Sequence, residues 1–262
     1  MARFVCEDSF VKLASYNLFQ GAQDTIRLLE DFVRENALDV LCLQEANDWQ
    51  NGTPSQLEAF AAATGLQHYV FGDSNTQYKL ATFSRYAIST SQVYTDGLWH
   101  SAIRTRIQTP GDETDIWNVH LNPGTEDDRL SEAHLIVPRV DPNVRTAITG
   151  DFNSLSETDE YPDTLISELT AQGIEKFGAD VLRFDVTNYL SRSGLIDVAA
   201  ALNKRACTVP TPANRDKFHA ARMRLDYMFV TESLMRSVQS IEVPRDTLTD
   251  QISDHYPVIL TA

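Results

Sequence analysis

Cysteine is scarce in this chain of 262 residues, in which only Cys6, Cys42 and Cys207 are present. They are widely spaced and odd in number, so they fit neither a zinc-binding spacing nor a framework of disulfides. The chain also becomes acidic at Glu7 and Asp8, too early for a secretory signal peptide. Because thiols stay reduced in the cytosol, these absences predict a cytoplasmic protein.

Long hydrophobic runs are absent as well. No apolar stretch approaches the ~20 residues that a transmembrane helix needs, and no amphipathic segment indicates a membrane anchor. Hydrophobic residues make up 42% of the chain and charged residues 23%, which is ordinary globular usage and excludes global disorder. The length suits one large α/β domain without a linker, so residues 1–262 are predicted to form a single domain. A monomer is the default prediction, because nothing in the sequence demands a dimer.

Positive charge is the third scarcity. The formal net charge is −15, with a pI near 4.7, which argues against a protein that coats nucleic acid by charge. An enzyme that meets phosphate through a bound cation is still compatible with this charge, since carboxylates that hold a divalent metal can attract anions. The exception is the segment 203–224, where six basic residues accompany one acid.

Stretches with strand character recur along the chain, separated by amphipathic stretches. In Asp24–Asn36, Ile26, Leu29 and Val33 share one helical face, and Asp24 is a candidate N-cap. Further helices are predicted from Pro54 to Gly65 and over Glu126–Val137, Asp163–Gln172 and Asp185–Ser191. Strands are predicted over Phe10–Asn17, Asp39–Gln44, Gln67–Phe71, Leu80–Ser84, Ile88–Thr95, Ala102–Gln108, Asp115–Leu121, Thr146–Thr149, Leu225–Val230 and Val258–Thr261.

The order of these elements indicates the fold class. Strands and helices alternate, but hairpin-like pairs of strands interrupt the alternation, which favours an α/β sandwich with mixed sheets over a purely parallel sheet. The segment Ser154–Gly178 is rich in Ser, Asp, Glu and Thr and is interpreted as a surface excursion.

Polar side chains stand at the ends of several predicted strands, where a core strand does not need them. Each one alone has an ordinary structural explanation, such as a loop carboxylate or an Asx-turn. Gly150 permits a sharp exit from its strand, after which Asp151 and Asn153 project to one side at a period of two. The other residues of this kind are Asn17, Glu45, His120, Asp226, Asp254 and His255.

In their order and spacing, these runs resemble the endonuclease/exonuclease/phosphatase superfamily, which is deoxyribonuclease-I-like. The matching segments are Tyr-Asn-Leu at 16–18, Leu-Gln-Glu at 43–45, Asn-Val-His-Leu at 118–121, Gly-Asp-Phe-Asn-Ser at 150–154, Leu-Asp-Tyr-Met-Phe-Val at 225–230 and Ser-Asp-His-Tyr-Pro-Val at 253–258. The resemblance covers nearly the whole chain. It implies a four-layer α/β sandwich with two mixed, mainly antiparallel β-sheets packed face to face and helices outside.

The resemblance also implies a metal site. Glu45 would be the metal-binding carboxylate, Asn17 would lie beside it, and Asp254 would complete the shell directly or through water. The chemistry agrees, because Mg²⁺ prefers oxygen ligands and commonly uses only one or two protein carboxylates. Mn²⁺ accepts the same oxygen ligands. The expected cofactor is therefore Mg²⁺ or Mn²⁺, with one ion or two left open.

Five further residues receive catalytic roles from the resemblance. Asp151 would position or deprotonate the attacking water, although it could instead protonate the leaving group or bind a second metal. Asn153 would hydrogen-bond a non-bridging phosphate oxygen and His120 a second one. His255 would contact the phosphate while Asp226 fixes its orientation. Nearby carboxylates should favour a protonated His255, because an opposite charge stabilises the imidazolium.

The basic segment leads directly into Asp226, so part of it is expected near the mouth of the pocket. Arg215, Lys217 and Arg222 are therefore candidate substrate-binding residues, together with His219.

The leading hypothesis is a divalent-metal-dependent phosphoesterase that hydrolyses phosphodiester bonds, either a nuclease or a phosphodiesterase of small substrates. Its partner would be a phosphate ester, including nucleic acid or a nucleotide. One alternative is a phosphomonoesterase that acts on a small or lipid-derived phosphate. Another is a non-catalytic binding module that kept the fold.

Overall fold

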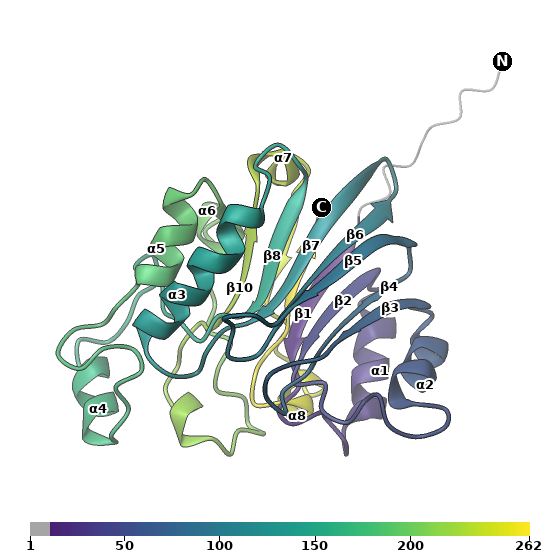
Figure 1. Ribbon diagram of the computed structural model, residues 1–262. Helices are drawn as coiled ribbons and strands as arrows, with labels where there is room; N and C mark the ends of the chain where they lie inside the picture. Colours follow the sequence, from purple (N-terminus) through teal and green to yellow (C-terminus); the bar gives the residue numbers. More distant parts are fainter. Residues whose placement is uncertain (1–10) are drawn as a thin grey trace.

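Two β-sheets lie face to face in the computed structural model, which describes residues 11–262 (Figure 1). Across the first sheet the strands are β11 (Ser240–Glu242), β12 (Val258–Thr261), β1 (Lys12–Asn17), β2 (Val40–Gln44), β4 (Leu80–Ser84) and β3 (His68–Gly72). Across the second they are β5 (Ile88–Tyr94), β6 (Ala102–Thr109), β7 (Asp112–His120), β8 (Thr146–Asp151), β10 (Asp226–Val230) and β9 (Ile196–Asp197).

Helices cover the outer faces of both sheets, so the molecule has four layers (Figure 1). On the first sheet lie α1 (Ile26–Glu35) and α2 (Gln56–Thr64), and on the second lie α3 (Glu126–Ile136) and α5 (Asp185–Arg192). The shorter elements are η1 (Val137–Arg139), α4 (Leu165–Ala171), α6 (Val198–Ala201), η2 (Lys217–His219), α7 (Glu232–Met235) and α8 (Thr249–Ile252). Strands β1 and β2 pair in parallel, as do β7 and β8, while the other pairs are antiparallel. The fold expected from the sequence is confirmed.

Side chains alternate between two cores along each central strand, because successive residues of a strand point to opposite faces. In β1, Ala14 and Tyr16 pack beneath α1 and α2, whereas Leu13 lies in the core between the sheets. In β10, Tyr227 packs toward α3 and α5, whereas Met228 faces the other sheet. The apolar residues of such a strand therefore determine which face of the sheet a polar residue at its end points to.

Buried amides join the two sheets at their centre. Gln44 Nε2 donates to Asn118 Oδ1 at 2.7 Å, and Asn118 Nδ2 donates to the carbonyl oxygens of Leu43 and Ala81 at 3.0 Å each. Both side chains are fully buried. These hydrogen bonds tie β7 to β2 and β4, two residues before the end of β7, and so set the spacing of the sheets near the polar strand ends.

Local sequence explains where the outer helices begin and end. Ser55 and Glu58 form a capping box at the start of α2, and Gly65 ends that helix with a φ of 77°, a conformation that glycine adopts without strain. The predicted Asp24 cap is wrong, because the N-cap of α1 is Thr25 and no side chain caps the helix. With Asp24 one residue outside the N-cap, its carboxylate is not used there.

The segment 154–178 is more than the surface excursion that its composition suggested. It contains α4 and contributes to a small core of its own, against which residues of the later chain pack. The residues of the segment in this core are Leu155, Leu165, Leu169, Ile174 and Phe177. Apolar residues are spaced among the polar ones along this segment, and their packing holds the segment in one position.

Two of the cysteines, Cys42 and Cys207, are free thiols, and Cys6 lies outside the described residues together with Glu7 and Asp8. Within residues 11–262, no helix is long and apolar enough to cross a membrane. The single domain and the monomer stay predictions.

Candidate active site

Three of the predicted residues stand in one row across the second sheet. His120 ends β7 and pairs with Asp151 at the end of β8, which in turn pairs with Asp226 at the start of β10. They continue the strand faces that look toward the first sheet. Asn17, at the end of β1, shares its strand face with Leu13 and points at them from that sheet, so four strands deliver their polar ends to one place.

Gly150 makes this arrangement possible. A Cβ on Gly150 would lie 1.8 Å from the carbonyl oxygen of Val119 on the neighbouring strand, and its φ of 145° suits only glycine without strain. Two site residues also adopt left-handed backbone conformations, Glu45 with φ 59° and Asn153 with φ 51°. Such conformations cost free energy in non-glycine residues and gather at functional sites.

Asp151 is the centre of the cluster. It is fully buried, and its carboxylate accepts hydrogen bonds from Asn17 Nδ2 at 3.0 Å and from the backbone N–H of Asn153 at 2.8 Å. Burial alone would raise its pKa, but the nearby His255 and His120 outweigh burial and lower it to about 2. Asp151 is therefore a carboxylate at neutral pH, held in place by two donors.

His255 carries the positive charge opposite Asp151. Its Nδ1 lies 2.8 Å from Asp226 Oδ2, which fixes the ring. Its Nε2 is buried without a hydrogen-bond partner and lies 3.8 Å from Asp151 Oδ2. Burial alone would lower the pKa of His255, but Asp226, Asp254 and Asp151 together raise it to about 10. The imidazolium thus presents a free N–H donor in the site at neutral pH.

His120 differs from His255 in charge. Its Nε2 lies 3.6 Å from Asp151 Oδ2, but burial, only partly offset by Asp151, lowers its pKa to about 4. Its ring stacks on that of His100 at a centroid distance of 4.2 Å, and His100 Nδ1 lies 2.6 Å from Thr76 Oγ1. His120 is therefore a neutral imidazole supported from behind.

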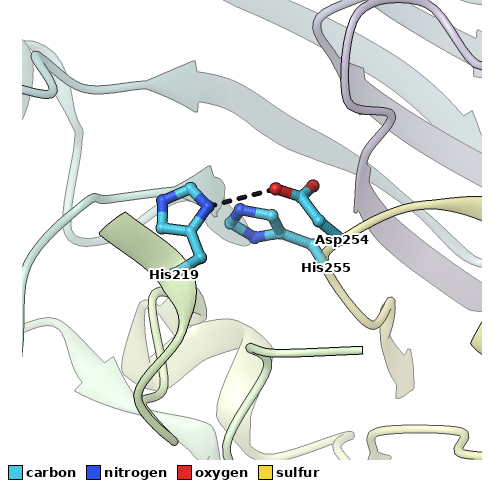
Figure 2. Close-up of side chains that lie close together, drawn as sticks. All are labelled: His219, Asp254 and His255. Carbon is cyan, nitrogen blue, oxygen red and sulfur yellow. Dashed lines mark hydrogen bonds and ion pairs between the residues drawn. The ribbon is translucent and has the colours of Figure 1, made fainter. Parts of the chain in front are cut away.

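His219 reaches the site from the basic segment. Figure 2 shows its ring joined to the Asp254 carboxylate by a hydrogen bond, 3.2 Å from Nδ1 to Oδ2, with His255 beside both. The His219 and His255 rings meet edge to face at 4.7 Å. Arg215, Lys217 and Arg222 are exposed and do not line the site cavity. Arg215 instead donates to the carbonyl oxygens of residues 212 and 214.

A cavity of about 580 Å³ opens over part of the site. Glu45, His120, Asp151 and Asn153 form part of its floor, and the segments 123–127, 173–179 and 216–219 supply its walls. Several lining residues were not predicted from the sequence, among them Tyr78, His100 and Lys176, because each lies in a loop without a motif.

The family model described as the Endonuclease/Exonuclease/phosphatase family matches residues 14–255, from before Asn17 to His255. The chain belongs to this family. The expected family membership is thereby confirmed, and the enzymes that the family is named after all hydrolyse phosphate ester bonds.

Solved structures share the fold of this family member. An AP endonuclease from Archaeoglobus fulgidus is 19% identical, with a TM-score of 0.71 over 95% of this chain and 98% of its own. An endonuclease/exonuclease/phosphatase from Beutenbergia cavernae DSM 12333 is 17% identical, with a TM-score of 0.67 over 96% and 71% of the two chains. TDP2 from D. rerio, complexed with a single-strand DNA product, is 17% identical, with a TM-score of 0.63 over 97% and 99%. No curated protein is similar enough in sequence to count as a match.

Members of the family generally use divalent metals, and the residues present fit such an ion. Glu45 accepts one hydrogen bond, from the backbone N–H of Gln20 at 2.8 Å, and within residues 11–262 it makes no ion pair. Burial raises its pKa to about 7, and the charges of Asp254 and Asp151 add to that effect. A buried carboxylate whose pKa is raised by burial and by neighbouring acids, and which keeps a free oxygen atom, is a ligand that a hard cation would neutralise.

Proposed function

We propose that this protein hydrolyses phosphodiester bonds with the help of a divalent metal, through in-line attack of water on phosphorus. The observation that carries the proposal is the meeting of opposite charges around Asp151. Its carboxylate lies 3.8 Å from Nε2 of the His255 imidazolium and lines the same cavity as Glu45, whose carboxylate makes no ion pair within residues 11–262.

Glu45 and Asp254 would hold the metal, and Mg²⁺ or Mn²⁺ suits their oxygen ligands. When bound, such an ion supplies charge that neutralises the phosphate and makes a coordinated water more acidic. Asn17 has its Nδ2 on Asp151, and its Oδ1 accepts from the backbone N–H of Phe19 at 3.1 Å. We therefore propose that Asn17 positions Asp151 as well as lying beside the metal.

Asp151 would orient the attacking water and accept its proton, because it is ionised at neutral pH and its position is held by two donors. The water oxygen forms a bond to phosphorus while the ester P–O bond on the far side breaks. The departing oxygen takes up a proton, and the products are an alcohol and a phosphomonoester. Because Asp151 is ionised at neutral pH, it fits the role of orienting water or binding a metal and does not fit the role of acid for the leaving group.

His255, His120 and Asn153 would hold the non-bridging oxygens. The free N–H of the His255 imidazolium is a charge-assisted donor, which is roughly twice as strong as a neutral one. Neutral His120 would add a second donor. One amide hydrogen of Asn153 is engaged, since Nδ2 donates to the Leu121 carbonyl oxygen at 3.1 Å, and the other would reach the phosphate.

A metal-supplemented screen tests this function. Single-stranded DNA, RNA, a dinucleotide, bis(p-nitrophenyl) phosphate and sugar or inositol phosphates would be assayed with Mg²⁺ or Mn²⁺ and with chelator. We expect hydrolysis of diesters that chelator removes and added metal restores. Glu45→Ala should abolish it, whereas Glu242→Ala, an exposed carboxylate outside the cavity, should retain it. Activity that survives both chelator and Glu45→Ala would refute the proposal, and hydrolysis of monoesters alone would favour a phosphomonoesterase.

A further inference from the structure

Lys176 is a cation that lines the site cavity and that no sequence motif predicts. It lies in the segment 154–178, between Ile174 and Phe177, whose side chains are 1% and 0% exposed in the core of that segment. The segment is thereby anchored on both sides of the lysine. Its ammonium group lies 4.9 Å from the ring centroid of Phe177 and lines the same cavity as Glu45 and Asp151.

The ammonium is directed at the residues that would meet phosphate. Lys176 Nζ donates to Asn153 Oδ1 at 3.0 Å. Asn153 follows Asp151 by two residues and donates from its backbone N–H to that carboxylate. An ammonium has three N–H donors, and within the described part of the chain Asn153 is the one hydrogen-bond partner of this group. Two donors are left for a ligand.

The charge of Lys176 has no direct counter-ion among residues 11–262. Its pKa is lowered to about 8 by burial, while Asp151, Asp216 and Asp254 oppose that shift and Arg129 adds to it. A partly buried cation without a carboxylate in contact is costly unless an anion joins it.

Arg183, the other strong cation of the cavity wall, differs in this respect. Its guanidinium is already engaged by Asp127 at 2.7 Å and by Asp185 at 2.8 Å. Lys176 is therefore the cation of the wall that is available to a substrate.

We infer that Lys176 binds the phosphate group of the substrate, on the side of the site formed by Asn153. This inference rests on the proposed function and adds a substrate-binding residue to it. The lysine would donate to a non-bridging oxygen while its bond to Asn153 holds both side chains in place. The segment 154–178 then has a use beyond its own packing, since it delivers a positive charge to a strongly acidic protein at the place where an anion must bind.

A purely structural role for Lys176 makes different predictions. If it only tied the segment to Asn153, its loss would lower stability and leave the affinity for anions unchanged. If it binds phosphate, its loss changes KM and phosphate affinity, and the change depends on whether the amine is protonated.

Three variants separate these roles, namely Lys176→Met, which keeps the length without charge, Lys176→Arg, which keeps the charge, and Lys204→Met as an exposed control outside the cavity. KM and kcat would be measured from pH 6.5 to 9.5, and the Kd of inorganic phosphate by calorimetry with Mg²⁺ present. At pH 7 we expect Lys176→Met to raise KM and the phosphate Kd roughly 10- to 100-fold, the usual effect of a lost hydrogen bond to a charged group. Lys176→Arg should restore most of the affinity, and Lys204→Met should match the wild type.

The pH profile gives the signature. The amine is protonated below its pKa of about 8, so the wild-type KM should rise above that pH, while the KM of Lys176→Met should not follow it. A Lys176→Met variant whose KM and phosphate Kd stay within twofold of wild type would overturn the inference. Failure of the proposed function would look different, because the wild type would then hydrolyse no phosphate ester, while the phosphate titration would still report on Lys176.

Discussion

At the scale of single residues, the charge of His255 is the feature on which the proposed chemistry depends most. The ring is 1% exposed, and burial alone would leave it neutral, as it leaves His120. The difference is the direct contact with Asp226, supported by Asp254 and Asp151, which raises the pKa of His255 to about 10. Two histidines of the same site therefore have opposite protonation states at pH 7 because their neighbours differ.

Asp226→Asn should remove that charge. Without the carboxylate, burial prevails, the pKa of His255 falls, and the phosphate loses an imidazolium donor. We expect kcat to fall roughly 10²- to 10³-fold, the usual effect of removing one donor that stabilises developing charge. Steady-state kinetics on a diester would measure this.

The double variant Asp226→Asn/His255→Ala is the control for this effect. It should be no slower than His255→Ala, because Asp226 acts through His255. Losses that multiply would show that Asp226 has another role.

At the scale of elements, the site is built where strand ends from two sheets meet, and its geometry depends on how the sheets are held together. The Gln44–Asn118 contact lies one strand position from Glu45 and two from His120. Buried hydrogen bonds of this kind contribute little net stability when they are intact, but unsatisfied partners are costly. The amides thus determine the spacing of the sheets more than they add to the hydrophobic core.

Asn118→Ala tests this role. The change leaves Gln44 and two carbonyl oxygens without their partner, so we expect a loss of roughly 1–3 kcal/mol in the free energy of unfolding together with reduced kcat. Urea unfolding and kinetics below the transition would measure both.

Ser55→Ala is the matched control, because it removes a helix cap remote from the cavity. It should cost about 1 kcal/mol without changing kcat. Full activity in Asn118→Ala would show that the buried amides do not determine the geometry of the site.

At the scale of the whole molecule, a chain of strong negative net charge is proposed to bind an anionic substrate. The net charge of −15 repels long polyanions, whereas His255 and Lys176 place positive charge near Asp151. A compact phosphodiester needs to meet only that local charge, whereas a polynucleotide must also lie along the acidic surface.

This contrast predicts the effect of salt. Raising monovalent salt from ~10 to ~150 mM shortens the Debye length from ~30 to ~8 Å, so repulsion of a single-stranded oligonucleotide weakens and kcat/KM on it should increase. On bis(p-nitrophenyl) phosphate the same change should have little effect. Stopped assays at fixed metal concentration would compare the two substrates. A steep decrease of oligonucleotide hydrolysis with salt would instead indicate a basic binding surface.

The motifs predicted much of the fold and the floor of the site, for a physical reason. Strand ends such as Asn17 and Asp151 are positioned by the apolar alternation before them, which is visible in the sequence. Lys176 and His100 were not predicted as site residues. Their approach to the cavity depends on the path of loops, which no periodic pattern in the sequence indicates. The basic segment shows both cases, since His219 meets Asp254 while Arg215 lies outside the cavity.

Sequence by itself determined the family, the two-sheet fold and the set of acids, amides and imidazoles at the strand ends, because these follow from local patterns of burial and turn residues. Only the tertiary structure decided the neutral state of His120, the contact of His219 with Asp254 and the entry of Lys176 into the cavity. Protonation depends on burial and on distances between side chains that lie far apart in the chain, such as Asn17 and Asp151, which are 134 positions apart. Distances of that kind exist only after the sheets have packed.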